Sequence, residues 1–265
     1  MRPTSLLPIL LTPLTLAQNT TIRYMPFGDS ITEIVCWRAK LWEKLQATPW
    51  NSSAVNFVGS GKSESQVGCK DTKYDRDNEG HSGFLAIDIA NKGQLDGWLK
   101  TNPADVVTMH LGTNDIVQQN KVGGTLRYSE DLGGEEGMEG IGLAVADIIK
   151  AFTTLVGTMR THNANMKIIV AQIIPMGTAT YNPKIQDLNK AIVPWAAGLN
   201  TTASPIWVVD QYTGFSSSDL RDGVHPNDSG DTKMTNVWYP ALVNAFGVVA
   251  KAEGEGKRRE VEFVA

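Results

Sequence analysis

Short apolar runs alternate with segments of helical periodicity along most of this chain. The apolar runs cover residues 22–27, 55–58, 105–111, 166–174 and 206–209. Apolar residues at helical spacing follow each run, over residues 37–45, 84–99, 148–159, 185–195 and 233–249. Parallel neighbours in a sheet need crossover connections, so this order predicts a parallel sheet with helices on both faces. We expect one α/β domain over residues 18–250, a three-layer α/β/α sandwich around a five-stranded parallel sheet.

The composition is that of an ordinary folded domain. Hydrophobic residues make up 42% and charged residues 20% of 265 residues, enough to bury a large core. The 24 Lys and Arg oppose 28 Asp and Glu, for a net charge of -4. Because no long basic run interrupts this mixture, we do not expect a protein that binds nucleic acid through counterion release.

The first 17 residues have the pattern of a secretory signal peptide. Arg2 supplies the positive start, residues 6–16 are mostly apolar, and small residues precede a cleavage point after Ala17. The apolar stretch is too short to cross a bilayer core of about 30 Å as a helix. We therefore predict a secreted protein with a signal peptide at residues 1–17 and no membrane association.

Secretion changes the interpretation of the two cysteines, Cys36 and Cys69. In an oxidising compartment an even pair without CxxC spacing is a disulfide candidate, and the bond would close a loop of about 33 residues. Loop entropy would then contribute about 3 kcal/mol. Two buried free thiols are the alternative. Glycosylation sequons occur at Asn19, Asn51, Asn200 and Asn227.

Two segments fall outside the strand and helix pattern. Residues 123–142 are rich in glycine and acidic side chains and too long for an ordinary connection. They could form a flap near the ligand crevice or a solvated loop without a catalytic role. Residues 251–265 carry many charges and little apolar content, which predicts a frayed or disordered tail.

Residues just after each apolar run are the places to look for chemistry, because a parallel sheet forms its ligand crevice at the carboxyl ends of its strands. Ser30, in Gly28-Asp29-Ser30-Ile31-Thr32, follows the first run. A serine on a tight strand-to-helix turn can be an exposed nucleophile. The alternative is a helix N-cap provided by Ser30 or Thr32.

Asp222 and His225 follow the fifth run. The carboxylate is three residues before the imidazole, close enough for a turn to bring them together, and an acyl-transfer site needs such a pair to take up a serine proton. An Asp turn with a surface histidine is the alternative. Asn114 follows the third run and offers an amide N–H toward an oxyanion. Gly83 lies earlier, just before the helical pattern at residues 84–99, and offers an unobstructed main-chain N–H.

The four segments together resemble the SGNH hydrolases, the GDSL esterase superfamily, in the family's own order. The family's GDS serine, glycine, GxND asparagine and DxxH pair correspond to Ser30, Gly83, Asn114, and Asp222 with His225. The resemblance implies a flavodoxin-like sandwich and a nucleophilic Ser30. It also implies an oxyanion hole formed by the N–H groups of Ser30 and Gly83 and the side chain of Asn114.

A narrower resemblance links residues 36–38, 77–83 and 225–228 to carbohydrate esterase family 3, whose known members are acetyl xylan esterases. It implies a serine esterase that removes O-acetyl groups from xylan or a related plant polysaccharide. Separately, we expect the protein to be a monomer. Many superfamily members have a glycine soon after the GDSxT block, where this chain has Glu33-Ile34-Val35, a difference that could alter the pocket wall. The alternatives are a lipase or lysophospholipase acting on longer acyl chains and a non-catalytic glycan-binding protein.

The remaining conspicuous polar residues have structural interpretations. Asp29 and Asp115 are expected to brace turns, and His110 to sit in the core. His81 and Arg38 could each contact substrate or stabilise the fold. No HExxH or calcium-loop spacing occurs, so we expect neither a metal nor a cofactor.

Overall fold

The computed structural model describes residues 21–62, 69–70, 73–118 and 139–264. The predicted signal peptide at residues 1–17, the Asn19 sequon and most of the glycine-rich segment lie outside the described residues. They remain predictions.

The centre of the molecule is a sheet in which every neighbouring pair of strands is parallel. Its main path runs in the order β2-β1-β4-β5-β6. The strands are β1 (Ile22–Gly28), β2 (Val55–Phe57), β4 (Val106–His110), β5 (Lys167–Gln172) and β6 (Ile206–Asp210). These confirm the five predicted strands. A sixth, β3 (Glu79–Gly80), pairs with the end of β1 and is too short to leave a pattern in the sequence.

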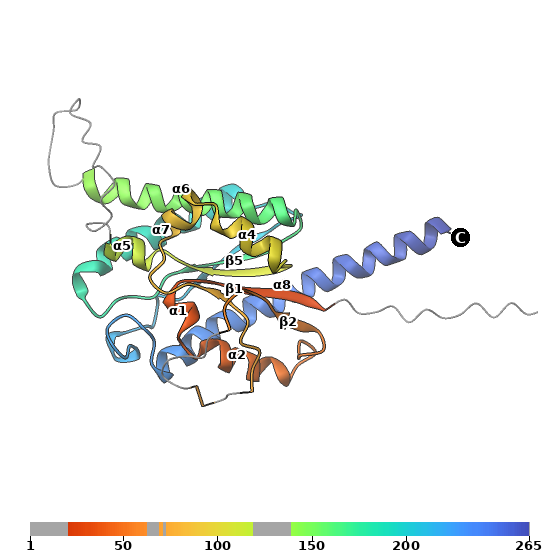
Figure 1. The fold of residues 1–265 in the computed structure, drawn as a ribbon, viewed down its shortest axis with the longest axis horizontal. Coiled ribbons are helices and arrows are strands. Elements are labelled where there is room, and N and C mark those ends of the chain that lie inside the picture. Colours follow the sequence, from red (N-terminus) through yellow and green to blue (C-terminus); the bar gives the residue numbers. More distant parts are fainter. Residues whose placement is uncertain (1–20, 63–68, 71–72, 119–138, 265) are drawn as a thin grey trace, which may run out of the picture.

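Helices cover both faces of the sheet, which confirms the predicted three-layer architecture (Figure 1). One face carries α3 (Ala86–Asn91), α4 (Gln94–Thr101), α6 (Glu139–His162) and α7 (Asn182–Leu199). The other carries α2 (Trp37–Gln46) and α8 (Asp228–Val264). The remaining helices are short: α1 (Ser30–Glu33), α5 (Thr113–Gln118), and the 3-10 turns η1 (Ala179–Tyr181) and η2 (Ser217–Asp219).

The sheet separates two hydrophobic cores. Because successive side chains of a strand point to opposite faces, Met25 enters the core beneath α6 and α7, and Tyr24 enters the core beneath α2 and α8. Both side chains are fully buried. The loops that follow the strands therefore meet at one edge of a rigid sheet, at the carboxyl ends of the strands.

Two segments differ from the sequence-based expectation. The helical pattern over residues 84–99 is divided into α3 and α4, because Gly93 adopts a left-handed conformation with φ of 62°. The expected frayed tail at residues 251–265 is helical through Val264, so α8 continues past the body of the sheet (Figure 1). Its Ala, Glu, Lys and Arg are good helix formers, and this local preference outweighs the lack of apolar residues.

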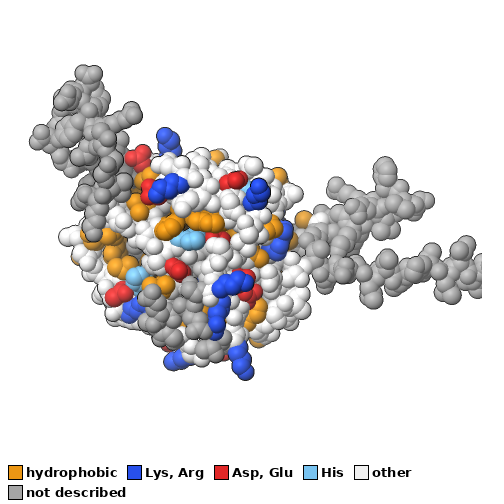
Figure 2. Space-filling view, viewed as in Figure 1, with side chains coloured by type: hydrophobic (Ala, Val, Ile, Leu, Met, Phe, Trp, Pro, Cys, Tyr) orange, Lys and Arg blue, Asp and Glu red, His pale blue; other side chains and the backbone are white. Residues whose placement is uncertain are grey.

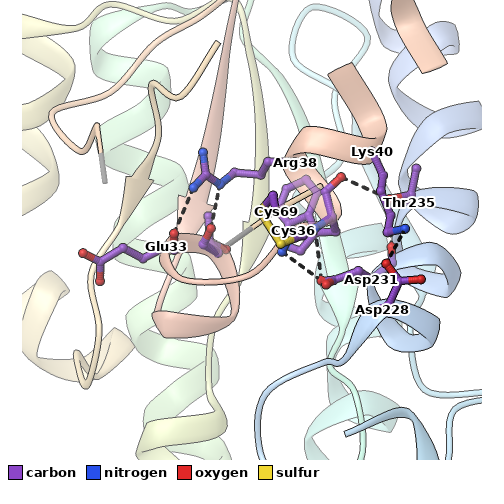
Figure 3. The surroundings of a disulfide bond; sticks show 10 residues. Glu33, Cys36, Arg38, Lys40, Cys69, Asp228, Asp231 and Thr235 are labelled. Atoms are coloured by element: carbon purple, nitrogen blue, oxygen red, sulfur yellow. Dashed lines mark hydrogen bonds and ion pairs between the residues drawn. A yellow bond between two sulfur atoms is a disulfide. The ribbon is translucent and has the colours of Figure 1, made fainter. Parts of the chain in front are cut away.

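Cys36 and Cys69 are joined in a disulfide, with their Cα atoms 5.4 Å apart. The bond connects the start of α2 to the segment that precedes β3 (Figure 3). The alternative of two free thiols is therefore wrong. Among the described residues, no helix has the length and apolar character needed to cross a membrane.

Candidate active site

Ser30 is the first residue of α1 and lies two residues after Gly28, the last residue of β1. The helix starts here because the Asp29 Oδ1 accepts a hydrogen bond from the Ile31 N–H at 2.9 Å. Asp29 is thus the N-cap, and the alternative reading of Ser30 or Thr32 as the cap is wrong. The Ser30 side chain is left for another partner.

That partner is His225. Its Nε2 lies 2.8 Å from the Ser30 Oγ, and its Nδ1 lies 2.8 Å from the Asp222 Oδ2. Both residues sit in the loop between β6 and α8, which is closed by an antiparallel bridge from Leu220 to Pro226. The structure therefore brings together the three residues expected from the sequence, in the order hydroxyl, imidazole, carboxylate.

The Asp222 carboxylate is held as an anion by the loop that carries it. Burial raises the pKa of Asp222, but hydrogen bonds from the His225 N–H, the His225 ring and the Val224 N–H outweigh that effect and place the pKa at about 2. An anionic partner at Nδ1 fixes the imidazole tautomer whose Nε2 can accept a proton from serine. The loop thus orients the base as well as carrying it.

Gly83 and Asn114 follow the two strands that flank the end of β1. Gly28 pairs with Gly80 of β3 on one side and with His110 of β4 on the other, so the loops after these strands start at the same edge. The Asn114 Nδ2 donates to the Phe84 carbonyl at 3.1 Å, which places the amide against the Gly83 turn. An amide nitrogen carries two hydrogens, so this contact orients the group and leaves a second N–H for a ligand.

Asp29 and Asp115 brace turns, as expected. The Asp115 carboxylate caps α3 by accepting from the N–H groups of Ala86 and Ile87 at 2.9 and 3.1 Å. Burial raises the pKa of Asp115, and it raises the pKa of Asp29 to about 7 against the opposing Ile31 N–H. Asp29 thus fixes the main chain of the Ser30 turn, and Asp115 fixes the start of α3.

His81, Arg38 and His110 have structural contacts. The His81 Nε2 lies 2.7 Å from the Glu79 Oε1, and its ring stacks on Trp98 with centroids 4.1 Å apart. The Arg38 guanidinium is buried and donates to the carbonyls of Thr32, Glu33 and Arg76. Figure 3 shows the guanidinium beside Glu33. His110 is buried, as predicted, and burial lowers its pKa to about 4.

A cavity of about 700 Å³ is bordered by the disulfide and by part of the loop that carries His225. Its described lining includes Lys40, Lys70, Arg221 and Pro226, but neither Ser30 nor His225. The cavity is therefore separate from the reacting groups. No group of three or more His, Cys, Asp or Glu side chains able to hold a metal ion occurs within the described ranges.

Comparison with known families gives this geometry a context. Residues 27–233, which include Ser30, Gly83, Asn114, Asp222 and His225, match the GDSL-like Lipase/Acylhydrolase family. The chain belongs to this family. It is therefore an esterase of the GDSL type, in which the triad described above lies within the matched segment.

Two solved structures of similar length share the fold. The crystal structure of an acetyl esterase mutant with acetate ion is 31% identical, covers 86% of this chain and 100% of that chain, and has a TM-score of 0.73. A carbohydrate esterase family 3 structure from Talaromyces cellulolyticus is 32% identical, covers 86% of this chain and 99% of that chain, and has a TM-score of 0.72. The predicted resemblance to carbohydrate esterase family 3 is confirmed.

A curated relative is much longer than this chain. A "Multidomain esterase" from Ruminococcus flavefaciens is 28% identical over 246 residues, which are 84% of this chain but 28% of the relative. The chain thus spans less than a third of that protein's length.

Proposed function

We propose that this GDSL esterase is a secreted enzyme that removes O-acetyl groups from xylan or a related plant polysaccharide through an acetyl-serine intermediate. The observation that carries the proposal is the continuous contact from the Asp222 carboxylate through His225 to the Ser30 hydroxyl. The likeness to an acetyl esterase and to a carbohydrate esterase family 3 structure supports an acetyl group on a carbohydrate as the substrate.

Ser30 attacks the acetyl carbonyl while the His225 Nε2 takes the hydroxyl proton. The negative charge that develops on the carbonyl oxygen is received by the N–H groups of Ser30 and Gly83 and by the Asn114 amide. His225 then gives its proton to the departing sugar oxygen, and acetyl-Ser30 remains. Water activated by His225 hydrolyses that ester, releases acetate and restores the hydroxyl. Asp222 stabilises the imidazolium in both steps.

Two other functions compete with this proposal. A lipase or lysophospholipase would use the same triad on longer acyl chains, and the family takes in lipases as well as acylhydrolases. A non-catalytic glycan-binding protein would have no need of a serine held 2.8 Å from an oriented histidine. The triad contact therefore favours an enzyme over a binding protein.

Acetate release by the purified chain tests the substrate class. We expect release from acetylated xylan to exceed release from other acetylated glycans, and 4-nitrophenyl acetate to be hydrolysed faster than 4-nitrophenyl esters of eight or more carbons. Faster hydrolysis of the long esters would show that the enzyme is a lipase and not an acetyl esterase. No hydrolysis of any ester would favour the glycan-binding protein.

Secretion and oligomeric state need separate measurements. When the full chain is expressed in a secreting host, N-terminal sequencing of the protein in the medium should begin directly after Ala17. Light scattering should give the mass of a monomer. A protein that stays inside the cell with residues 1–17 still attached would contradict secretion.

A further inference from the structure

Glu33 connects the helix of the nucleophile to the turn that carries Gly83. It is the last residue of α1, whose first residue is Ser30. One carboxylate oxygen, Oε2, accepts a hydrogen bond from the Ser82 N–H at 2.7 Å and another from the Ser82 hydroxyl at 2.5 Å. Ser82 directly precedes Gly83. In Figure 3, Arg38 reaches the main chain of Glu33, and the Glu33 carboxylate points away from both Arg38 and the disulfide.

The main chain already brings these two segments into contact. A Cβ added to Gly80 would lie 2.6 Å from the Glu33 nitrogen, so β3 can approach α1 this closely only because residue 80 is glycine. One residue later, the His81 N–H donates to the Gly28 carbonyl at 3.0 Å. The turn at residues 81–83 therefore leaves the sheet immediately beside the nucleophile.

The space next to the Gly83 Cα is open. Gly83 has a φ of 80°, and a Cβ added there would meet nothing within 4 Å. Hydrogen bonds restrain both sides of Gly83: Glu33 accepts from the Ser82 N–H, and the Gln118 Nε2 donates to the Gly83 carbonyl at 3.2 Å. Ser82 and Gly83 are both exposed, so water could replace the contact with Glu33 at little cost in stability.

We infer that Glu33 is a positioning residue for the oxyanion hole, which it serves by fixing Ser82 so that the Gly83 N–H faces the carbonyl oxygen of the bound ester. The inference rests on the proposed roles of Ser30 and Gly83. An oxyanion hole accelerates a reaction because its donors are already oriented when charge develops. Because Glu33 belongs to the same helix as Ser30, its hydrogen bonds to Ser82 fix the position of the Gly83 N–H relative to the nucleophile.

The test compares single variants of the purified full chain on 4-nitrophenyl acetate, with kcat counted per serine titrated by an organophosphate. Removing an oxyanion donor lowers kcat about 10² to 10³-fold. Glu33→Ala leaves the Gly83 N–H in place but less well oriented, so it should lower kcat only about 10-fold. KM should change less than about twofold, because the ground-state carbonyl is bound more weakly than the oxyanion. The melting temperature should stay within about 2 °C, since the contact is exposed.

Three further variants connect the effect to Ser82. Glu33→Gln keeps an acceptor oxygen and should recover part of kcat. Ser82→Ala keeps the main-chain N–H, so its kcat should fall less than that of Glu33→Ala. If both residues act through one contact, the kcat of the double variant should equal that of Glu33→Ala. Glu43→Ala, which removes an exposed glutamate of the neighbouring helix α2, should behave like the wild type.

Three results would overturn the inference: an unchanged kcat in Glu33→Ala, a raised KM at constant kcat, which would make Glu33 a substrate contact, or losses in the double variant that add. Ser30→Ala has no nucleophile to titrate, so its rate is counted per mole of folded protein, and it separates this failure from failure of the proposed function. If Ser30→Ala is inactive and Glu33→Ala is not impaired, only the positioning role is lost. If Ser30→Ala is as active as the wild type, the proposed mechanism is lost as well.

Discussion

The His225 imidazole lies 2.8 Å from the Ser30 hydroxyl, although 195 residues separate them in the sequence. The contact joins the loop before α8 to the end of β1, the strand nearest the N-terminus among the described residues. Each strand of a parallel sheet ends at the same edge, so a loop late in the chain can supply a base to a nucleophile near its start.

Ser30→Ala tests that contact directly. Loss of the nucleophile in an enzyme with a triad leaves only the contributions of binding and the oxyanion hole, so we expect esterase activity to fall at least about 10³-fold. The fold should persist, because Asp29 and not Ser30 caps α1. Initial rates on 4-nitrophenyl acetate and circular dichroism of the same preparation check both statements. Activity near that of the wild type would reject the triad.

The Cys36–Cys69 disulfide should be worth about 3 to 4 kcal/mol, because it closes a loop of 33 residues in the unfolded chain. Cys36→Ser with Cys69→Ser should lower the free energy of unfolding by that order. Urea titration followed by tryptophan fluorescence measures the difference, and thiol counting under denaturing, non-reducing conditions should find no free thiol in the wild type. Two free thiols would mean that the bond does not form.

The sequence predicted those features that repeat along the chain or stand in a local motif. The five longer strands came from apolar runs, and Ser30, Asn114 and His225 were found because each follows a strand in a recognisable block. β3 was missed since two residues leave no periodicity, and the break at Gly93 was missed since apolar spacing continues across it.

Contacts between side chains distant in the sequence left no such signal. Glu33 stood out only as part of a segment without the usual glycine, and its hydrogen bonds to Ser82 span 49 residues. Asp231 had no sequence signal at all, yet its Oδ1 accepts hydrogen bonds from the N–H groups of Cys36 and Trp37 at 3.1 and 3.0 Å (Figure 3). The first contact depends on how α1 packs beside β3, and the second on how α2 packs on α8. No local pattern in the sequence encodes either arrangement. The face seen in Figure 2 adds no further signal, since both signs of charge are scattered there among hydrophobic and polar groups.

The same Asp231 should make stability depend on pH. Burial raises its pKa from 3.8 to about 7, in spite of the hydrogen bonds from Cys36 and Trp37. Between about pH 4 and pH 7 the folded chain therefore keeps a proton that the unfolded chain has lost. Its contribution to stability is present below pH 4 and is lost as the pH rises through 7.

Asp231→Asn keeps an oxygen acceptor for the two N–H groups and cannot ionise. Its melting temperature, relative to that of the wild type, should rise between pH 4 and pH 8 by on the order of 10 °C. Asp29, whose pKa is also raised to about 7, is present in both proteins and cancels in the comparison. Thermal scans at pH 4, 6 and 8 measure the difference, and a difference independent of pH would contradict the assignment.

Asn114→Ala separates stabilisation of the oxyanion from binding of the substrate. If the Asn114 amide bonds the charged tetrahedral oxygen more strongly than the neutral carbonyl, its removal should cost about 10² to 10³ in kcat with a smaller change in KM. The variant also loses the 3.1 Å hydrogen bond to the Phe84 carbonyl, which helps to hold the Gly83 turn. Gln118→Ala, which removes the 3.2 Å bond to the Gly83 carbonyl, is therefore a matched control for loss of a turn contact. We expect its kcat to fall much less than that of Asn114→Ala. Equal losses in the two variants, or a lower melting temperature with unchanged kcat in Asn114→Ala, would make Asn114 a structural residue of the turn.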